Sequence, residues 1–165
     1  MKRPSQTALR AALLLLGAMA AAIASPANAF ALWTDIAADA IPATGERLIQ
    51  PDRFRAVALD VEEMRARLSL TPLEGTAAAA SREVLELPLP AGGLGRFAIV
   101  ESPVMAPELG ARYPEIRTYA GLGLDDPSAT ARLDLTPAGF HAIILATGGT
   151  VYIDPFQRGD VVHYQ

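Results

Sequence analysis

The residues best suited to chemistry in this sequence are one histidine and two aspartates in its last third. His141 lies in a stretch where apolar and polar residues alternate, as in a half-buried β-strand, and Asp134 and Asp154 lie in neighbouring stretches of the same kind. Pairing of Leu135 with Phe140 across a turn would place Asp134 directly opposite His141, with Asp154 diagonal to it. The Cβ atoms of directly opposed residues are roughly 4.5–5.5 Å apart, so a carboxylate here could orient the imidazole as a general base.

The surroundings of His141 favour binding over catalysis. These strands carry no serine to act as a nucleophile, and a metal site usually needs three or four ligands. The sequence has no cysteine, which excludes a thiol nucleophile and a thiolate zinc site. We therefore predict no catalytic residue, no metal and no cofactor, and interpret Asp134, His141 and Asp154 as a cross-strand salt bridge on a solvated face that contacts a partner. A small hydrolase that uses His141 with Asp134 is a further hypothesis.

A second group of candidate contact residues is Tyr113, Glu115, Arg117 and Tyr119. They occupy alternate positions of a predicted strand and would therefore share one face. Aromatic residues and arginine are enriched in the energetically important parts of protein interfaces, so this stripe is a candidate partner-binding edge. In the alternative interpretation the tyrosines bury their rings against a short helix and the two charges pair.

Three predicted strands must position the histidine and the aspartates. They span residues 129–135, 140–146 and 150–156 and are joined by two short glycine-containing turns. Pairing of Leu135 with Phe140 and of Thr147 with Thr150 gives this meander one entirely apolar face and one largely polar face. A slip of one residue would exchange the two faces, so the turns and the core agree on the register.

The elements that precede the meander alternate between strands and short helices. A strand is predicted over residues 54–59, followed by a helix over 61–69 that Asp60 and Glu63 begin as a capping box. Residues 82–89 and 96–102 form a β-hairpin, and Pro107 opens a short helix that ends near residue 112. With a further strand over 116–121, the predicted fold class is α+β. It is mainly one curved antiparallel β-sheet, a hairpin plus the three-stranded meander, with two short helices.

The first 29 residues have the pattern of a signal peptide. A positively charged start is followed by an apolar run over residues 11–24 and by Ala27-Asn28-Ala29, which predicts cleavage after Ala29. The run is shorter than the roughly 20 apolar residues that span a bilayer, so a membrane anchor is the less favoured alternative. We expect the mature chain to be exported to the periplasm or the extracellular space.

The mature chain is predicted to have two parts, a loosely ordered lead-in over 30–52 and one β-rich domain over 53–165. It keeps 11 of the basic residues and all 18 acidic ones, so its net charge changes from −4 to −7. An acidic domain without a basic run is a poor candidate for binding nucleic acid, where neutralising phosphates dominates the affinity. We expect neither a nucleic-acid partner nor a membrane partner after cleavage.

Four segments of the domain resemble a known family. They are residues 101–105 (ESPVM), 113–119 (YPEIRTY), 136–141 (TPAGFH) and 151–155 (VYIDP). Together with the surrounding sequence, from about Phe54 to Tyr164, they are similar to the N-terminal, pre-catalytic region of secreted bacterial reprolysin-like zinc metallopeptidases. The family's His-Glu-x-x-His zinc motif is not in this sequence, so the resemblance supplies no catalytic or zinc-binding residue.

The resemblance implies a non-catalytic, exported prodomain-like domain, as a fragment of a longer chain or as a free-standing protein. Its expected partner is a metallopeptidase catalytic domain in cis or in trans, which it would help to fold or would cover. Because cysteine is absent, any inhibition should be steric or by strand pairing into the cleft. The alternative is an independent secreted β-rich binding module for an extracellular or cell-surface ligand.

Overall fold

A computed structural model describes residues 31–165 of the chain. The predicted signal peptide over residues 1–29 and its cleavage at Ala29 lie outside the described residues. Within residues 31–165, no helix is both long enough and apolar enough to cross a membrane.

The fold is α+β with mainly antiparallel sheet, as predicted, but the strands form two sheets rather than one. The smaller sheet has the order β1-β2-β9, with β1 at Trp33–Asp35, β2 at Val57–Leu59 and β9 at His163–Tyr164. The larger sheet runs in sequence order through β3 (Glu83–Pro88), β4 (Leu94–Glu101), β5 (Arg117–Gly123), β6 (Thr130–Thr136), β7 (Gly139–Ala146) and β8 (Gly149–Ile153). The helices are α1 (Val61–Ser69) and α2 (Pro107–Gly110), with 3-10 turns at Ala38–Ala40 and Ala77–Ala80.

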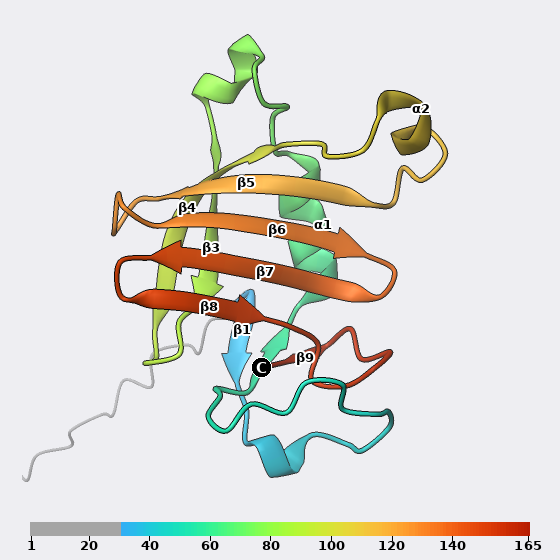
Figure 1. Cartoon of the computed structure of the whole chain (residues 1–165), viewed down its shortest axis with the longest axis vertical. Helices are drawn as coiled ribbons and strands as arrows, with labels where there is room; N and C mark the ends of the chain where they lie inside the picture. Colours follow the sequence, from blue (N-terminus) through green and yellow to red (C-terminus); the bar gives the residue numbers. More distant parts are fainter. Residues whose placement is uncertain (1–30) are drawn as a thin grey trace, which may run out of the picture.

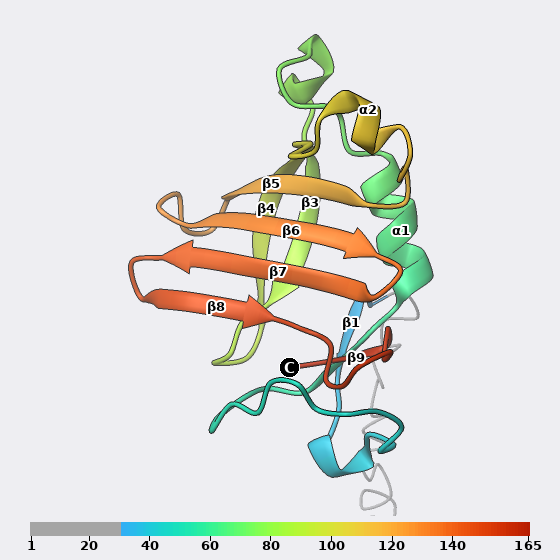
Figure 2. The same ribbon diagram turned by 45° about the vertical axis from the view of Figure 1, so that its right-hand side comes forward.

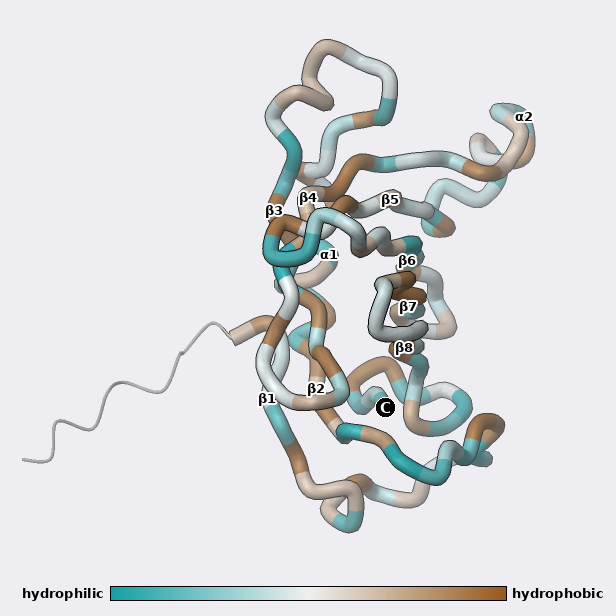
Figure 3. The backbone as a smooth tube through the Cα atoms, turned by 60° about the vertical axis from the view of Figure 1, so that its left-hand side comes forward, coloured by the Kyte–Doolittle hydropathy of each residue, from teal (hydrophilic) through white to brown (hydrophobic). Residues whose placement is uncertain are grey.

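The six-stranded sheet is strongly curved and encloses the core on one side. Strands β3 and β4 run steeply across the direction of β5 to β8, and α1 lies behind the sheet (Figures 1 and 2). Seen from the side, β1, β2 and β3 lie opposite β6, β7 and β8 (Figure 3). Hydrophobic stretches occur in both groups of strands. Among residues 31–165, no helix or strand covers the opposite face of β5 to β8 (Figure 1).

The register of the meander confirms the predicted faces. Leu135 pairs with Phe140 as expected, whereas Ala146 pairs with Gly149 in place of the expected Thr147–Thr150 pair. The loop keeps two residues but begins one residue earlier, which shifts the register by two and leaves every side chain on its predicted face. The buried members of the apolar face are Ala131, Leu133, Leu135, Phe140, Ala142, Ile144 and Ile153.

Helix α1 has the predicted bounds, but its first turn is capped from one side only. The carboxylate of Asp60 accepts a hydrogen bond from the Glu63 backbone N–H at 3.0 Å, as an N-cap residue should. The side chain of Glu63 does not reach back; it accepts a hydrogen bond from Arg67 at 2.8 Å, one turn further along. Met64 and Leu68 on the opposite side of the helix are buried in the core.

The segment predicted as a loosely ordered lead-in, residues 30–52, is partly built into the fold. Trp33 is buried in the core and its indole N–H donates to the backbone carbonyl of Glu86 at 2.9 Å. The strand that Trp33 begins, β1, pairs with β2. Further along, Ile41 packs with Ala56 and Phe156, and the Gly45 N–H donates to the side chain of Gln157 at 3.2 Å. Contacts along the segment, apart from those of Trp33, therefore also hold it to the domain.

The C-terminal residues His163 and Tyr164 form β9 against β2. Tyr164 is fully buried and packs edge-on against Trp33 and Phe140, with ring centroids 5.6 and 6.3 Å away. Its hydroxyl accepts a hydrogen bond from the Phe140 N–H and donates one to the Val161 carbonyl, both at 3.0 Å. Both ends of the described chain therefore meet in one aromatic cluster.

Candidate functional site

The site is built on the solvent-facing side of the six-stranded sheet. Strand pairing places one line of polar residues across it, in the order Ser102, Thr118, Asp134, His141 and Asp154. The next line along the strands is Val100, Ala120, Arg132, Ile143 and Tyr152. These residues follow from the period-two pattern, because side chains at alternate positions share a face.

A groove of about 580 Å³ runs over these two lines, and we call it the outer groove. It is lined by Val104, Thr118, Tyr119, Arg132, Leu133, Asp134, His141, Ala142, Ile143, Tyr152 and Asp154. The three residues singled out from the sequence for their chemistry thus lie together in it. Leu145 and Leu122 continue the same face beyond the groove, and both are exposed.

Asp134 and His141 form the predicted cross-strand pair. They are directly opposite in the β6–β7 ladder, and the Asp134 carboxylate lies 3.2 Å from His141 Nδ1. The hydrogen bond to Asp134 raises the pKa of His141 above its ordinary value, although partial burial opposes this. Both side chains remain more than a third exposed, so the pair adds little to stability.

Asp154 lies closer to His141 than predicted. Continuing the β7–β8 register by one residue places it directly opposite His141, and not diagonal to it. Burial raises the pKa of Asp154, with the neighbouring His141 charge acting in the opposite direction. In residues 31–165 its carboxylate forms no ion pair, so the groove holds a half-buried acid that a cationic partner could neutralise.

Arg132 does not serve as that cation. Its guanidinium donates to the hydroxyl of Ser102 at 3.1 Å, and Thr118 donates to the Ser102 carbonyl at 2.7 Å. Ser102 is buried and lies three strands away from His141. Strands are about 4.8 Å apart, so the hydroxyl and the imidazole are separated by roughly 14 Å. This spacing gives no nucleophile–base pair, and the hydrolase hypothesis has no geometric support.

The stripe predicted from Tyr113 to Tyr119 does not lie along one strand. β5 begins only at Arg117, and Tyr113 and Glu115 precede it in the turn after α2, where both are exposed. Tyr119 is 2% exposed and belongs to the core, while Arg117 pairs with Glu101 at 3.4 Å. Pro114 disfavours helical geometry at Tyr113, but it does not start a strand there. The prediction that Tyr113 and Glu115 share a strand with Arg117 and Tyr119 is therefore wrong. Glu115, Arg117 and Tyr119 still line a small crevice beside α1.

Tyr152 and Arg132 are the residues of this site that the sequence interpretation did not select. Tyr152 is 62% exposed on the edge strand β8, next to Ile143, and lines the outer groove together with Asp154. The same alternation that selected Asp134 and His141 also places Arg132 and Tyr152 on their face. The missing information was the tertiary surroundings, since the pattern does not say which outward side chains border a groove.

No group of three or more His, Asp or Glu side chains is arranged to hold a metal ion in the part of the chain that the structure describes. Compared with known proteins, the chain matches no protein-family model, no curated protein and no solved structure.

Proposed function

We propose that this chain is a non-catalytic, exported, prodomain-like domain that binds a metallopeptidase catalytic domain through the outer groove. The observation that carries the proposal is the composition of that groove. An exposed Tyr152, the aliphatic Ile143 and a half-buried, unpaired Asp154 share one open sheet face. An apolar anchor beside a polar group that lacks a partner is the arrangement by which interfaces gain both affinity and specificity.

The charge of the groove indicates which groups of a partner it would meet. Asp134 is already engaged with His141, and Arg132 is directed to Ser102. Asp154 is therefore the acid left for a partner's lysine or arginine. A cation brought within about 4 Å would favour the charged form of Asp154 and offset the cost of its burial. The surrounding apolar residues would exclude water from that contact.

The class of partner comes from the sequence resemblance to the pre-catalytic region of reprolysin-like zinc metallopeptidases. In this proposal the catalytic domain lies in cis or in trans, and the sheet face covers part of its surface until it is removed. The zinc chemistry belongs to that partner. The domain acts by steric cover or by assisting folding, because it offers no thiolate for the metal.

The test is to add the purified chain to the catalytic domain of a reprolysin-like metallopeptidase and to measure hydrolysis of a peptide substrate and the yield of refolded enzyme. We expect either a lower rate or a higher yield, and we expect Asp154→Lys to weaken the effect at least tenfold. Asp39→Lys, a change of the same charge at an exposed residue of the first 3-10 turn, should have no effect. No binding, no change of rate and no change of yield would exclude the peptidase as partner.

The alternative of an independent binding module uses the same groove with a different ligand. It is supported by the same exposed Tyr152 and predicts that the chain binds an extracellular ligand while leaving the peptidase unaffected. Loss of that binding in Tyr152→Ala, with the peptidase unaffected by the wild-type chain, would establish it over the first proposal.

A further inference from the structure

The outer edge of β8 carries backbone groups that no strand of residues 31–165 pairs. β8 is the last strand of the six-stranded sheet, and on its inner side it pairs with β7. The two-residue turn makes Ala146 and Gly149 a hydrogen-bonded pair, so Gly149, Val151 and Ile153 bond to β7. The N–H and C=O groups of the alternate residues, Thr150 and Tyr152, therefore point away from the sheet. Such an edge is a template for a further strand.

A cavity of about 480 Å³ lies along this edge, and we call it the edge groove. It touches every residue from Thr150 to Asp154. Since neighbouring side chains of a strand point to opposite faces, a cavity that touches all five residues must follow the strand's edge. Its other walls are Ile49, Pro51, Arg53, Phe54, Arg55, Val57, Pro88, Leu89, Pro90 and Gln165. Most of this lining is apolar.

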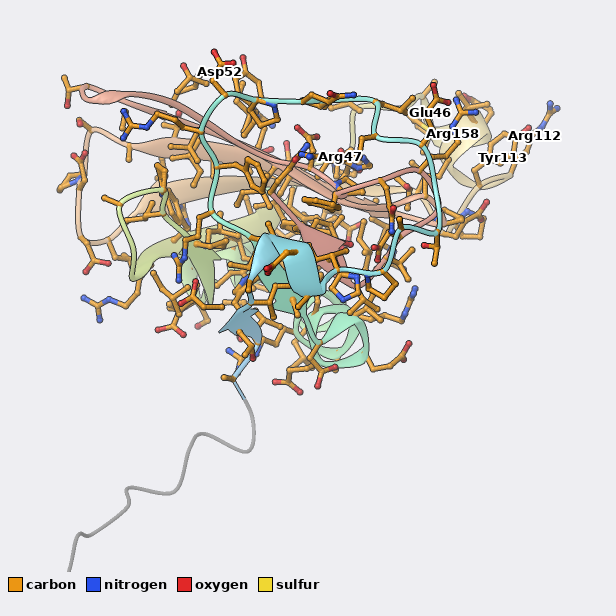
Figure 4. All side chains as sticks on the ribbon, turned by 90° about the horizontal axis from the view of Figure 1, so that it is seen from below. Glu46, Arg47, Asp52, Arg112, Tyr113 and Arg158 are labelled. Carbon is orange, nitrogen blue, oxygen red and sulfur yellow. The ribbon has the colours of Figure 1, made fainter. Side chains whose placement is uncertain are left out.

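Hydrogen bonds and cation–π contacts fix the wall opposite β8. The side chain of Gln165 accepts from Arg47 at 2.5 Å and donates to the Ile49 carbonyl at 2.9 Å. Arg55 donates to the carbonyls of Leu89 and Gly93 at 2.9 and 2.6 Å. Figure 4 shows Arg47 pointing from its loop into the molecule, where its guanidinium lies 4.1 Å from the centre of the Phe156 ring. The groove is therefore preformed, which lowers the entropic cost of binding.

The pairing just beyond β8 shows how an added strand would run. Asp154 and Gln165 exchange two backbone hydrogen bonds, at 3.2 and 3.0 Å, and Phe156 donates to the His163 carbonyl at 2.8 Å. This is an antiparallel ladder on the same edge. Its next hydrogen-bonding positions along β8 are Tyr152 and then Thr150, and both are vacant in residues 31–165.

We propose that the edge groove binds an extended peptide segment, which adds to the six-stranded sheet as a strand antiparallel to β8 and in line with β9. The main-chain groups of Thr150 and Tyr152 supply the hydrogen bonds, and the apolar walls take alternate side chains. The edge groove shares Tyr152 and Asp154 with the outer groove. This inference goes beyond the proposed function because it assigns the binding to the main-chain groups of β8 and the ligand to an extended segment.

The side chains of the groove specify the peptide's composition. Peptide residues paired with Thr150 and Tyr152 point to the outer face, and the one paired with Tyr152 lies diagonal to the half-buried carboxylate of Asp154, where a basic residue fits. The residues between them point inward toward Val151 and Leu89, which favours valine or leucine. The expected ligand thus alternates apolar and basic residues over about five positions, because the free edge extends from Gly149 to Ile153 and Asp154 already pairs with Gln165.

The first test measures binding of the fluorescently labelled peptide Lys-Val-Lys-Val-Lys-Val to the full chain by fluorescence anisotropy. N-methylation of the lysine amides removes the hydrogen bonds to β8 and should weaken binding at least tenfold, whereas N-methylation of the valine amides should change it less than twofold. The peptide Glu-Val-Glu-Val-Glu-Val should bind at least fivefold more weakly. Absence of binding, or equal losses in the two N-methylated series, would overturn the proposal.

The second test removes one donor from the protein. Thr150→Pro eliminates an N–H that does not pair with β7, and proline is tolerated at such edge positions. We expect it to weaken peptide binding three- to tenfold, while Thr150→Ser, which keeps the N–H, binds as the wild type does. Unchanged binding in a folded Thr150→Pro variant would contradict the model of strand addition. If that variant does not fold, the difference in affinity between the two N-methylated peptide series tests strand addition instead. Neither result depends on a peptidase, so failure here and failure of the proposed function are separable.

Discussion

The two faces of the β6–β7 hairpin differ in how completely the protein satisfies its own side chains. On the inner face Leu133 and Phe140 are buried, and the aromatic ring lies among other rings at T-shaped angles. On the outer face, one residue along in each strand, Asp134 and His141 form a half-exposed pair beside an acid with no ion-pair partner among the described residues. The buried side chains of the inner face therefore hold the fold together, whereas the outer face remains available for binding. Changes on the two faces should therefore separate stability from binding.

The largest loss of stability is expected for Tyr164→Ala on the inner side. The substitution removes a fully buried ring that contacts Trp33 and Phe140, so unfolding should become easier by about 3–5 kcal/mol. Tyr164→Phe keeps the ring but leaves the Phe140 N–H without its acceptor, at a cost of about 1–3 kcal/mol. Urea denaturation followed by tryptophan fluorescence measures both. Equal stability of the two variants would contradict a packing role for the ring.

The turn between the two strands should be the next most sensitive position. Gly139 has a φ of +128°, and a Cβ added to it would lie 3.0 Å from Pro155 Cγ and 3.3 Å from the Tyr164 hydroxyl. Gly139→Ala should therefore cost roughly 1–3 kcal/mol through backbone strain and crowding. The matched control is Gly148→Ala in the other turn, where a Cβ has open space and φ is unstrained. Thermal melts of both variants measure the difference, and a Gly148→Ala effect as large as that of Gly139→Ala would refute the explanation.

Tyr152→Ala should show the opposite behaviour on the outer face. Because the side chain is 62% exposed, its removal should change the free energy of unfolding by less than about 0.5 kcal/mol. Partner binding at the outer groove should nevertheless fall at least tenfold, since tyrosine is enriched among the residues that dominate interface energies. Denaturation and binding measured on the same preparation test this. A large loss of stability would mean that this face belongs to the core.

The smallest effect concerns pH. Asp134 raises the pKa of His141 in the folded state above the value of about 6.5 that is usual for an unfolded chain. The charged pair therefore stabilises the protein fully below about pH 6.5, and this contribution is lost as the pH rises through the folded-state pKa. Comparing the Tm of the wild type and His141→Asn at pH 5.5 and pH 9 should show a small advantage of the wild type at pH 5.5 only. A Tm difference in favour of the wild type that increases with pH would mean that the pKa of His141 is lowered, and not raised, in the folded state.

Much of the local structure could be predicted from the sequence. Asp60 and the spacing of Met64 and Leu68 gave helix α1 its bounds. The alternation of residues in β6 and β7 placed Asp134 opposite His141, because a period of two leaves few registers that bury the apolar side. The prediction of which residues border the outer groove was less complete, and it omitted Tyr152.

The predictions for residues 30–52, for the C-terminal strand and for Tyr119 failed for one reason. The local sequence pattern contains no information about contacts between segments that are far apart in the chain. Trp33 belongs to a stretch with mixed composition, and only its packing against the distant Tyr164 makes β1 part of the domain. The two residues that form β9 are too few to predict as a strand without β2 beside them. Tyr119 alternates with Arg117 as the sequence suggested, yet it lies opposite Leu133 in the β5–β6 ladder, on the side of the sheet that faces the core, so its ring is buried.

The sequence by itself determined which side chains share a face, because strand geometry fixes that over a few residues. It also determined the absence of thiol chemistry and the start of the first helix. Tertiary structure alone decided that the two ends of the described chain meet around Tyr164. It also decided that, within residues 31–165, Asp154 lies half-buried without an ion-pair partner and β8 keeps a free edge beside a cavity. These features arise where segments far apart in the sequence approach each other, and the energy of such contacts depends on both partners at once.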